Sequence, residues 1–494
     1  MRNLKDNRAT LNKLDDKIKD KCAVFGVSID NKGDYRNNIA AELAYNALLT
    51  MQHRGQESAG IAVVRNKTIM CKKNSGLVTK VFAPNSLNDM QSCIAIGHCQ
   101  YSAIELAAED AIQYDIQNEI QPSVTEYLTG RIATVLNGSI TNVRELREEL
   151  MTYGLTFAGT SDGEVISKLV AYHCMLMEQN AEGFEAESVL EGVKYAAKLL
   201  EGSFSLLVMN TGKESNKLLA VRDSNGFRPL CIGVNEYGTA VASESCALDI
   251  CGYDFVRDVN PGEVVQIENG KITYAETVLP PGTKNTGLCV LEYVYLARPD
   301  SFMDDLSVYE ARVNMGRILA REVQIEADVV CGVPDSGLEA ALGYSLESDI
   351  PLVNGFMRNR YIGRSFIYPT QSSRENAVKL KFNPLKLNVE GKRIILVDDS
   401  IVRGTSTGQI VRELKKAGAR EVHMLVSSPP MKYSCKFGCI DTEDEKKLAA
   451  NSMSKDEFCE KIGADSLHYI SIAGLKEACQ KCSIQQCIQC FEAP

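Results

Sequence analysis

Two adjacent carboxylates and a run of hydroxyl side chains lie close together near residue 400. Residues 392–407 start with an apolar run, continue with Asp398 and Asp399, and end with Gly404 and three hydroxyl residues. Acids at the carboxyl end of a buried strand can accept ribose hydroxyls or approach a hydrated Mg²⁺ ion. Backbone amides at the start of the next helix form an anion site, to which the hydroxyls add donors. The segment therefore predicts a site for a phosphorylated ribose.

Residues 392–407 allow two other interpretations. An ordinary strand, turn and helix would use the Asp and Thr side chains only as caps, but two adjacent acids that end a buried strand are costly without partners. A nucleotide-binding P-loop requires the pattern G-x-x-x-x-G-K-[ST], which this segment lacks. We therefore prefer a phosphate-binding turn.

A second segment, residues 358–371, concentrates cations in an otherwise acidic chain. It is followed by three more basic residues, namely Arg374, Lys379 and Lys381. A solvated charged surface is the plain alternative. Gly363 and Pro369 mark the segment as a loop, and we expect it to act as a mobile lid that neutralises pyrophosphate.

Cys22 is a candidate nucleophile, although a cysteine that opens a β-branched run is more often buried than catalytic. The interpretation changes because of the motifs that accompany it in the first half of the chain. Polar motifs rich in Gly, Asn, Asp and Ser recur at 53–61, 97–102, 136–139, 160–164 and 221–230. Such a set is more than a buried cysteine requires.

Two kinds of domain are expected to position these residues. From residue 22 to residue 270, short β-branched runs and two amphipathic stretches, at 39–51 and 189–200, predict an α+β domain with large sheets. From about residue 288 the pattern alternates between helix and strand, which indicates an α/β domain with a parallel, doubly wound sheet. The expected helices and strands there are 311–326, 327–331, 338–346, 394–397, 407–417 and 422–426.

The motifs resemble two known families joined in one chain. Residues 392–407 are similar to the signature of the type I phosphoribosyltransferases. The motifs of the first half occur in the order found in class II glutamine amidotransferases, so the chain from Cys22 onward resembles the amidophosphoribosyltransferases. The resemblance implies an N-terminal-nucleophile glutaminase domain, an αββα sandwich, at 22–270 and a phosphoribosyltransferase domain at 285–475. A leader, 1–21, and a cysteine-rich tail, 476–494, complete the chain.

The resemblance also implies a reaction and residue roles. Glutamine, phosphoribosyl pyrophosphate and water would give 5-phosphoribosylamine, glutamate and pyrophosphate, the first step of de novo purine biosynthesis. Cys22 would form a γ-glutamyl thioester, with Asn137 and the Gly138 amide as oxyanion hole. The residues implied to bind glutamine are Arg54, Gln100 and Asp162. Those implied to bind phosphoribosyl pyrophosphate are Arg358, Arg364, Asp398, Asp399, Ser400, Arg403, Gly404, Thr405, Ser406 and Thr407. Ser336 would join Asp398 and Asp399 around Mg²⁺.

Cys22 needs a free α-amino group to act as the family's nucleophile. An α-amine with a pKa of about 7.7–8.0 is matched to deprotonate a thiol of about 8.5. The amide of an internal cysteine cannot serve as that base. We therefore expect residues 1–21 to be removed, by self-cleavage. The alternative is that the leader stays and Cys22 is inert.

Four positions depart from the family pattern. Gln100 replaces an arginine that holds the glutamine carboxylate, and Ala103 replaces a threonine. Leu136 and Ser139, on either side of the retained Asn-Gly pair, replace a histidine and an asparagine. A neutral amide cannot give the bidentate, charge-assisted contact of a guanidinium. The glutaminase half is therefore expected to be weak, retuned or dependent on free ammonia.

The 17 cysteines are many for a chain that lacks any secretory signal. A disulfide framework is a poor explanation in the cytosol. By resemblance, four thiolates would bind a [4Fe–4S] cluster in one branch of the family: Cys289, Cys435, Cys487 and Cys490. Nearby Cys439, Cys479 and Cys482 compete for this assignment, and zinc is the alternative metal.

The composition of the chain limits the classes of partner that it is expected to bind. The net charge of −10 and the absence of an apolar run of membrane length give no reason to expect a nucleic acid or a membrane. We expect a cytoplasmic protein. The family implies a homo-oligomer, a tetramer or a dimer, with purine nucleotides as feedback inhibitors. Two other functions remain open: an ammonia-dependent phosphoribosyltransferase with an impaired glutaminase domain, and a non-catalytic sensor of phosphoribosyl pyrophosphate.

Overall fold

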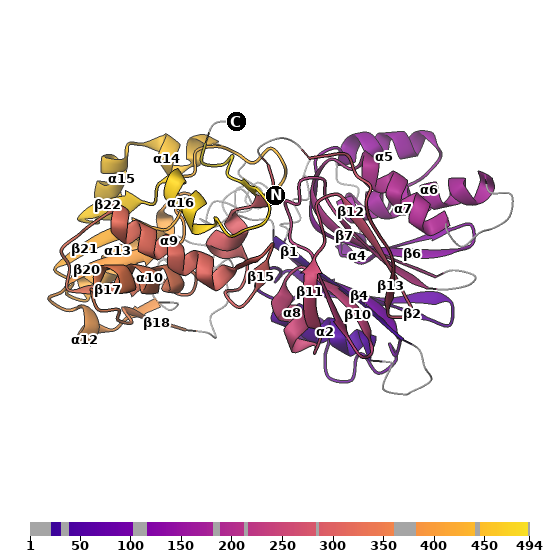
Figure 1. Cartoon of the computed structure of the whole chain (residues 1–494), viewed down its shortest axis with the longest axis horizontal. Coiled ribbons are helices and arrows are strands. Elements are labelled where there is room, and N and C mark those ends of the chain that lie inside the picture. The colour runs from indigo at the N-terminus through magenta and orange to yellow at the C-terminus, as the bar shows by residue number, and fades with distance from the viewer. Residues whose placement is uncertain are drawn as a thin grey trace, which may run out of the picture.

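The computed structural model describes residues 21–30, 39–101, 116–180, 188–211, 216–282, 286–359, 382–439 and 445–492. Two lobes lie side by side, the first half of the chain in one and the second half in the other (Figure 1). Each lobe has its own sheet system and hydrophobic core. This arrangement confirms the expected change from an α+β to an α/β pattern.

Two antiparallel sheets form the first lobe. One has seven strands in the order β11 (Asp254–Asp258), β9 (Cys231–Asn235), β10 (Gly238–Ala242), β1 (Lys21–Ile29), β4 (Ile94–Tyr101), β2 (Ser58–Arg65) and β3 (Thr68–Ser75). The other has six, in the order β13 (Lys271–Thr277), β12 (Glu263–Glu268), β8 (Lys217–Arg222), β7 (Gly202–Thr211), β6 (Gly130–Ile140) and β5 (Ser123–Tyr127).

The two sheets pack face to face, with helices on both outer sides. Val24, Val135 and Leu207 belong to the core between the sheets. The residues on alternate positions of β1 and β6 face the outer helices instead, because successive side chains of a strand point to opposite faces. The helices of this lobe are α2 (Ala40–Thr50), α3 (Val78–Val81), α4 (Ile116–Glu119), α5 (Val143–Thr152), α6 (Asp162–Asn180), α7 (Ser188–Leu199) and α8 (Ser245–Ile250).

This architecture is the expected αββα sandwich, with one difference at its end. The limit expected at residue 270 falls in the turn between β12 and β13. Because β13 pairs with β12 along the whole strand, the sheet of the first lobe extends to Thr277.

The second lobe contains a four-stranded parallel sheet in the order β17 (Val329–Gly332), β20 (Arg393–Asp398), β21 (Glu421–Val426) and β22 (Ser466–Tyr469). Ile395 and Val397 of β20 face α9 (Val308–Glu322), α10 (Leu338–Ser348) and α16 (Ile472–Ala478). Ile394 and Leu396 face α13 (Thr405–Lys416) and α15 (Lys455–Ile462). The sheet is therefore covered on both faces, as expected for a doubly wound domain.

Shorter elements connect the sheet to its surroundings. They are η3 (Glu292–Leu296), which is a π-helix, the 3-10 helix η4 (Glu445–Lys447), α12 (Lys386–Val389), α14 (Ala449–Ser452), and the two-stranded pairs β15 (Phe302–Met303) with β16 (Leu306–Ser307) and β18 (Phe356–Arg358) with β19 (Phe382–Pro384).

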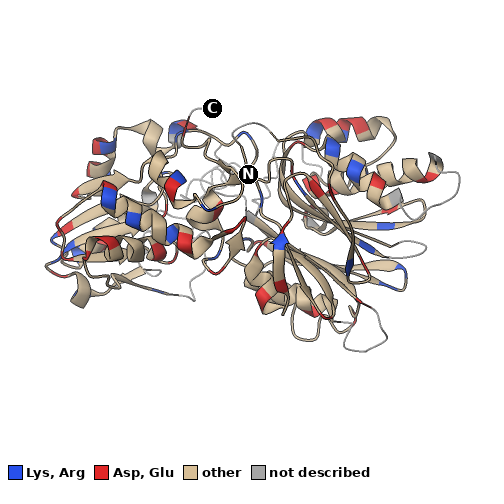
Figure 2. Cartoon of the chain, in the orientation of Figure 1, with Lys and Arg blue, Asp and Glu red and all other residues tan. Residues whose placement is uncertain are grey.

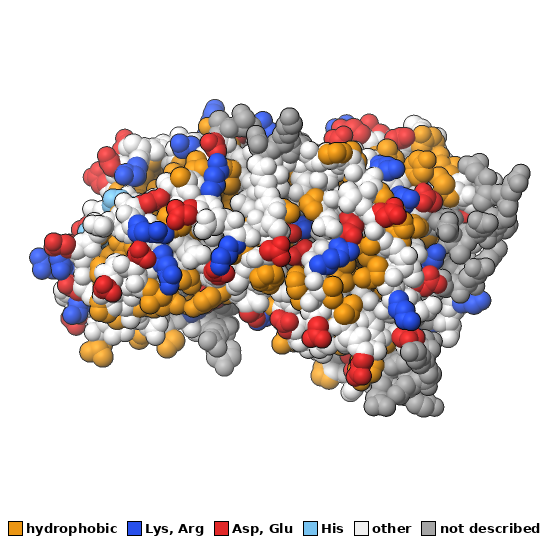
Figure 3. Space-filling model, in the orientation of Figure 1, with side chains coloured by type: hydrophobic (Ala, Val, Ile, Leu, Met, Phe, Trp, Pro, Cys, Tyr) orange, Lys and Arg blue, Asp and Glu red, His pale blue; other side chains and the backbone are white. Residues whose placement is uncertain are grey.

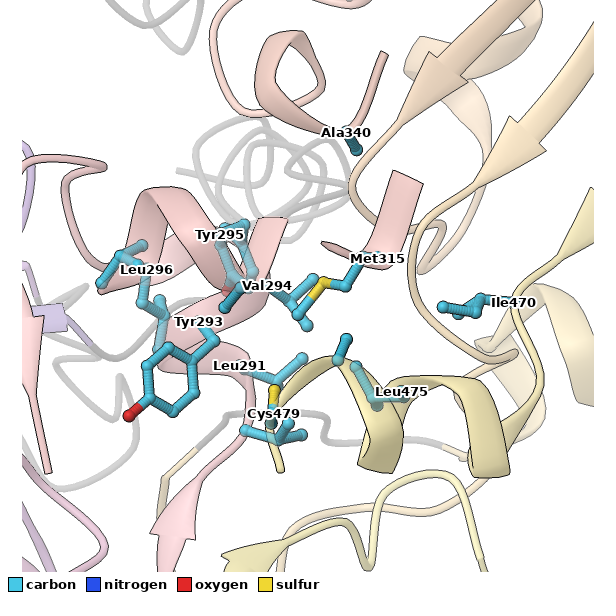
Figure 4. Close-up of a cluster of buried hydrophobic side chains, with 14 of the residues drawn as sticks. Leu291, Tyr293, Val294, Tyr295, Leu296, Met315, Ala340, Ile470, Leu475 and Cys479 are labelled. Atoms are coloured by element: carbon cyan, nitrogen blue, oxygen red, sulfur yellow. The ribbon is translucent and has the colours of Figure 1, made fainter. Parts of the chain in front are cut away.

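The C-terminal tail returns to the start of the second lobe. Strand β23 (Gln486–Cys487) pairs in parallel with β14 (Leu288–Cys289). The π-helix η3 follows β14, and its apolar residues pack against α9 and α16 (Figure 4). The beginning and the end of this lobe therefore share one core.

Buried arginines join the two lobes. Arg222 of β8 donates to both carboxylate oxygens of Asp304, at 2.9 and 2.8 Å. Arg54 contacts Glu244 of the first lobe and Glu292 of η3. The side chain of Arg54 and both of its carboxylate partners have no exposed surface. Such pairs hold the lobes in one relative orientation, because a separated partner would leave a charge buried and unpaired.

Charges on the surface are mixed in sign. Lys and Arg alternate with Asp and Glu over both lobes (Figure 2), and the face drawn in Figure 3 has no continuous basic region. None of the helices in the described part of the chain has the length and apolar character that a bilayer crossing demands.

His98 links the two sheets of the first lobe. Its Nε2 atom lies 3.0 Å from the carbonyl oxygen of Leu136 on the opposite sheet. Complete burial lowers the pKa of the imidazole to about 4, although the hydrogen bond opposes this shift. The ring is therefore neutral in the folded protein at neutral pH, whereas an unfolded chain protonates it below about 6.5.

This difference in protonation predicts a pH-dependent loss of stability. As pH falls from 6.5 towards 4, the unfolded chain gains a proton that the folded chain does not, so the free energy of unfolding decreases by about 2 kcal/mol at pH 5. We expect the Tm of the unchanged protein to fall by about 2–4 °C more than that of His98→Gln between pH 7 and pH 5. Equal falls in both proteins would contradict this role.

Candidate functional site

Cys22 lies at the beginning of β1, in the middle of the seven-stranded sheet. Its partner across the antiparallel ladder is Gln100 of β4, which is also opposite Ser58 of β2. The Ser58 hydroxyl donates to the Gln100 Oε1 atom at 3.0 Å. The structure therefore places the unusual glutamine directly beside the proposed nucleophile.

Asn137 and Gly138 approach the same end of β1 from the other sheet. The Asn137 Nδ2 atom lies 3.4 Å from the Ser243 hydroxyl, which in turn accepts the backbone amide of Val24 at 2.9 Å. Ser243 therefore links Asn137 to Val24, which is two residues from Cys22 along β1. The amide side chain is fully buried, and no described group donates a hydrogen bond to its Oδ1 atom.

Only glycine fits at position 138. Its φ is +132°, and a Cβ atom there would lie 1.9 Å from the carbonyl oxygen of Ser203. The backbone amide of Gly138 therefore has a fixed direction next to Asn137. A pair of rigid donors is what stabilisation of an oxyanion requires.

Asp162 is the first residue of α6 and carries a carboxylate without a basic partner among the described residues. Its Oδ2 atom accepts the backbone amide of Ile140 at 3.0 Å. Burial raises the pKa of the Asp162 carboxyl, although that hydrogen bond opposes the shift. A buried acid of this kind is stabilised by a cation, and an amino-acid α-ammonium would provide one.

Arg54 occupies a different environment from the one expected for a glutamine ligand. Its guanidinium group is enclosed by Glu244 and Glu292 and has no exposed surface. Glu244 also accepts hydrogen bonds from His53 and from the Ser301 hydroxyl. We therefore assign Arg54 a positioning role at the junction of the lobes.

The second candidate site lies at the carboxyl end of β20. Gly404 has a φ of +79°, and a Cβ atom there would lie 2.1 Å from the Phe458 ring of α15. This glycine allows the chain to turn directly into α13. Gly404 precedes α13 and has no side chain that could cap the helix. The first backbone amides of this 12-residue helix are therefore directed at the turn between β20 and α13, which is the arrangement that an anion site requires.

Two acids and a serine converge at this turn. Asp399 is fully buried, and its carboxylate accepts hydrogen bonds from the hydroxyls of Ser336 and Ser400. Asp398 is 6% exposed, and its Oδ1 atom accepts the Asp399 amide at 2.9 Å. Ser336 follows β17, whereas Asp398 and Asp399 lie at the end of β20. The structure therefore brings together residues that are far apart in the sequence.

The structure describes only some of the remaining residues that are expected to bind the phosphates. Arg358 forms an ion pair with Asp335, the neighbour of Ser336, so the first cation of the expected lid segment reaches this edge of the sheet. Arg403 is half-buried in the turn, Ser406 is exposed and Thr407 is buried at the start of α13. The backbone of Thr405 begins the helix. Arg364 lies outside the described residues, as do Ser102 and Ala103.

A group of thiols forms a third candidate site. Cys289 of β14 lies opposite Cys487 of β23 in the parallel ladder. The backbone oxygen of Cys490 accepts the amides of Lys432 and Tyr433, at 2.9 and 3.1 Å, which holds the tail against the loop that contains Cys435. The three segments that carry the four cysteines expected to bind a cluster are therefore adjacent.

The donor set of this group suits a thiophilic cofactor. Within the described ranges, no three His, Cys, Asp or Glu side chains are close enough together to hold a metal ion. Binding of a cofactor therefore requires the thiols to draw together and lose their protons.

Several important residues were not expected from the sequence. Glu244, Glu292 and Arg228 are fully or almost fully buried at the junction of the lobes. A charged residue inside an apolar run is the signal that could have identified Glu292, which interrupts residues 288–297. Burial of such a residue requires an opposite charge from elsewhere in the fold.

Comparison with known proteins supports the division of the chain. Residues 108–249 match the family described as a glutamine amidotransferase domain, and residues 310–434 match the phosphoribosyl transferase domain. The first match lies in the αββα lobe and the second in the doubly wound lobe. Both matches agree with the fold class expected from the sequence.

Similar proteins cover almost the whole chain. An amidophosphoribosyltransferase of Methanocaldococcus jannaschii is 41% identical over 92% of this chain and 94% of its own length, and one of Bacillus subtilis is 36% identical over 96% and 94%. A solved structure described as the allosteric regulatory enzyme of purine biosynthesis has a TM-score of 0.82, with 36% identity and 96% of both chains covered. The B. subtilis glutamine phosphoribosylpyrophosphate amidotransferase, complexed with ADP and GMP, has a TM-score of 0.81, with 34% identity and the same coverage. This chain belongs to the amidophosphoribosyltransferase family.

Proposed function

We propose that this chain transfers the amide nitrogen of glutamine to the anomeric carbon of phosphoribosyl pyrophosphate. The products are 5-phosphoribosylamine, glutamate and pyrophosphate. The observation that carries the proposal is the pairing of two sites in one chain. The Cys22 site is built for acyl transfer, and the turn between β20 and α13 is built for a sugar phosphate.

The phosphate turn supports the second half of the reaction. Asp399 is held by Ser336 and Ser400, so its carboxylate is oriented before any ligand binds. The first amides of α13 would bind the 5′-phosphate, and the acid pair would accept the ribose hydroxyls. Asp398, Asp399 and Ser336 present the oxygen ligands that Mg²⁺ prefers, and Mg²⁺ supplies charge neutralisation for the departing pyrophosphate.

The first half of the reaction would use the Cys22 site. The thiolate attacks the γ-carbonyl of glutamine, the tetrahedral oxyanion accepts donors from Asn137 and Gly138, and ammonia leaves as the thioester forms. Asp162 would hold the α-ammonium. Water then hydrolyses the thioester to glutamate. Dependence on ammonia alone is the second candidate function, and Gln100 is the observation that favours it.

The thiol group supports a [4Fe–4S] cluster on Cys289, Cys435, Cys487 and Cys490. A cluster bound there would connect the tail to the loop at 431–439 and to β14, because these three segments already touch. Its contribution would be structural, since it would add four bonds to the short β14–β23 ladder and the few backbone hydrogen bonds that join the tail to these segments. Zinc is the alternative metal for the same thiols.

We base the proposed regulation and assembly of this chain on its relatives. A solved relative binds ADP and GMP, and we propose that purine nucleotides inhibit this enzyme too. A homo-oligomer, a tetramer or a dimer, and a cytoplasmic location complete the proposal.

Removal of the Asp399 charge tests the phosphoribosyl site. Asp399→Asn keeps the shape of the side chain but removes a metal-facing charge, so we expect kcat/KM for phosphoribosyl pyrophosphate to fall about 10²–10³-fold, with glutamine or ammonia as donor. Magnesium-dependent pyrophosphate release measures both reactions. Asp328→Asn, at the opposite end of the sheet, is the matched control. Unchanged ammonia-dependent activity of Asp399→Asn would overturn the proposal.

Gln100→Arg tests the altered carboxylate site. A guanidinium group beside Cys22 restores a charge-assisted, bidentate contact, so we expect the KM for glutamine to fall about tenfold, with ammonia-dependent activity unchanged. Gln100→Lys adds the charge without the planar fork and should give a smaller gain. If neither variant lowers the KM for glutamine, Gln100 is not at the carboxylate-binding position.

Mass spectrometry of the purified protein tests removal of the leader. We expect glutamine-dependent activity only in chains that begin at Cys22, because the α-amine is the base for the thiol. Cys22→Ala should lose the activity with glutamine and keep the activity with ammonia. Glutamine-dependent activity in a preparation that begins wholly at Met1 would contradict this requirement.

A further inference from the structure

One row of the seven-stranded sheet carries polar side chains from three neighbouring strands. Cys22 of β1 lies opposite Gln100 of β4, and Gln100 lies opposite Ser58 of β2. Residues that lie directly opposite each other in a sheet project from the same face. The three side chains therefore form one polar row, in which Gln100 is between the proposed nucleophile and a serine.

The adjoining row shows which face this is. Its members pack in the core below the outer helices, and they are Ala23, Cys99 and Ala59. Successive residues of a strand alternate between the two faces, and Val24 belongs to the core between the sheets. The polar row that contains Gln100 therefore faces the second sheet, from which Asn137 approaches the same end of β1.

Ser58 holds the oxygen end of the Gln100 amide. Ser58 is 4% exposed, and its hydroxyl donates to Oε1 at 3.0 Å. The backbone oxygen of Gln100 accepts the Glu57 amide at 3.0 Å, so the backbone that carries this side chain is also held. A glutamine side chain has one acceptor oxygen and one nitrogen with two N–H donors. With its oxygen directed at β2, the amide offers its two donors to a ligand.

The direction of this amide decides which group can bind beside it. The guanidinium of Arg54 cannot neutralise a bound carboxylate, because it is enclosed by Glu244 and Glu292 and has no exposed surface. A neutral amide binds a carboxylate through its N–H donors, whereas its oxygen repels the anion. A Gln100 side chain turned by half a rotation would therefore reject the group that the present orientation accepts.

We infer that Ser58 is a positioning residue for the α-carboxylate of glutamine. The inference rests on the proposed function of the Cys22 site. By donating to Oε1, the Ser58 hydroxyl keeps the Nε2 group of Gln100 directed at the ligand. The two N–H donors then bind the carboxylate in place of the guanidinium of the family pattern. Ser58 acts through Gln100, and its removal allows the amide to adopt either orientation.

Ser58→Ala tests this role. Loss of one neutral hydrogen bond should raise the KM for glutamine about three- to tenfold, with kcat within about twofold. The Kd for glutamine, measured by titration calorimetry with Cys22→Ala as background, should rise by the same factor. Gln100→Glu, whose side chain has no donor, should raise both constants further. Ser28→Ala, at a buried serine near the opposite end of β1, is the matched control and should change neither.

A double variant separates this role from a general effect on the sheet. The guanidinium of Gln100→Arg carries donors on every nitrogen and has no acceptor, so it does not need Ser58 to select one end. Addition of Ser58→Ala to Gln100→Arg should therefore change the KM for glutamine by less than about twofold. Ammonia-dependent activity and Tm identify any variant that fails to fold.

Two results would overturn the inference. One is an unchanged KM and Kd in Ser58→Ala. The other is an equal rise in KM when Ser58→Ala is combined with Gln100 or with Gln100→Arg, since the serine would then act on the sheet and not on the amide. A chain that binds glutamine without turnover would instead reject the proposed glutamine-dependent reaction, and the Kd values would still decide the role of Ser58.

Discussion

The buried pairing of arginines with carboxylates at the junction of the lobes is the constraint on which both sites depend. Arg54 and Arg222 belong to the first lobe, and their partners Glu292 and Asp304 belong to the second. Removal of one partner from such a pair costs about 3–5 kcal/mol, because the other charge stays buried. The lobes therefore cannot separate or rotate cheaply. A fixed orientation matters for an enzyme that makes ammonia in one lobe and uses it in the other.

The same charges support the catalytic and thiol groups on either side. Glu292 lies between Arg54, which follows the helix beside β1, and Arg228, which holds the loop of Cys439. Glu292 also belongs to the π-helix that begins three residues after Cys289. Buried ion pairs and one hydrogen bond to a backbone oxygen thus connect the glutaminase lobe to the loop at 431–439.

Local patterns in the sequence predicted many of the helices and strands, including the strand, turn and helix around residue 400. The expected helix at 39–51 is α2 (Ala40–Thr50), and the expected strand at 394–397 is β20, because hydrophobic periodicity and turn residues are local signals. The contact of Ser336 with Asp399 was expected from family resemblance. The junction was not, since the partner of a buried charge such as Glu292 is set by tertiary packing.

The pairing of β23 with β14 has a consequence for the order in which the molecule is completed. Cys487 and Cys490 follow Cys289 by some two hundred residues, so they are not yet made when the segment of β14 leaves the ribosome. Cys289 is made some two hundred residues earlier, and domains generally fold in the order of their synthesis. Pairing of β23 with β14 is therefore a late step, which follows synthesis of the whole parallel sheet. A chain that stops before Cys487 cannot complete it.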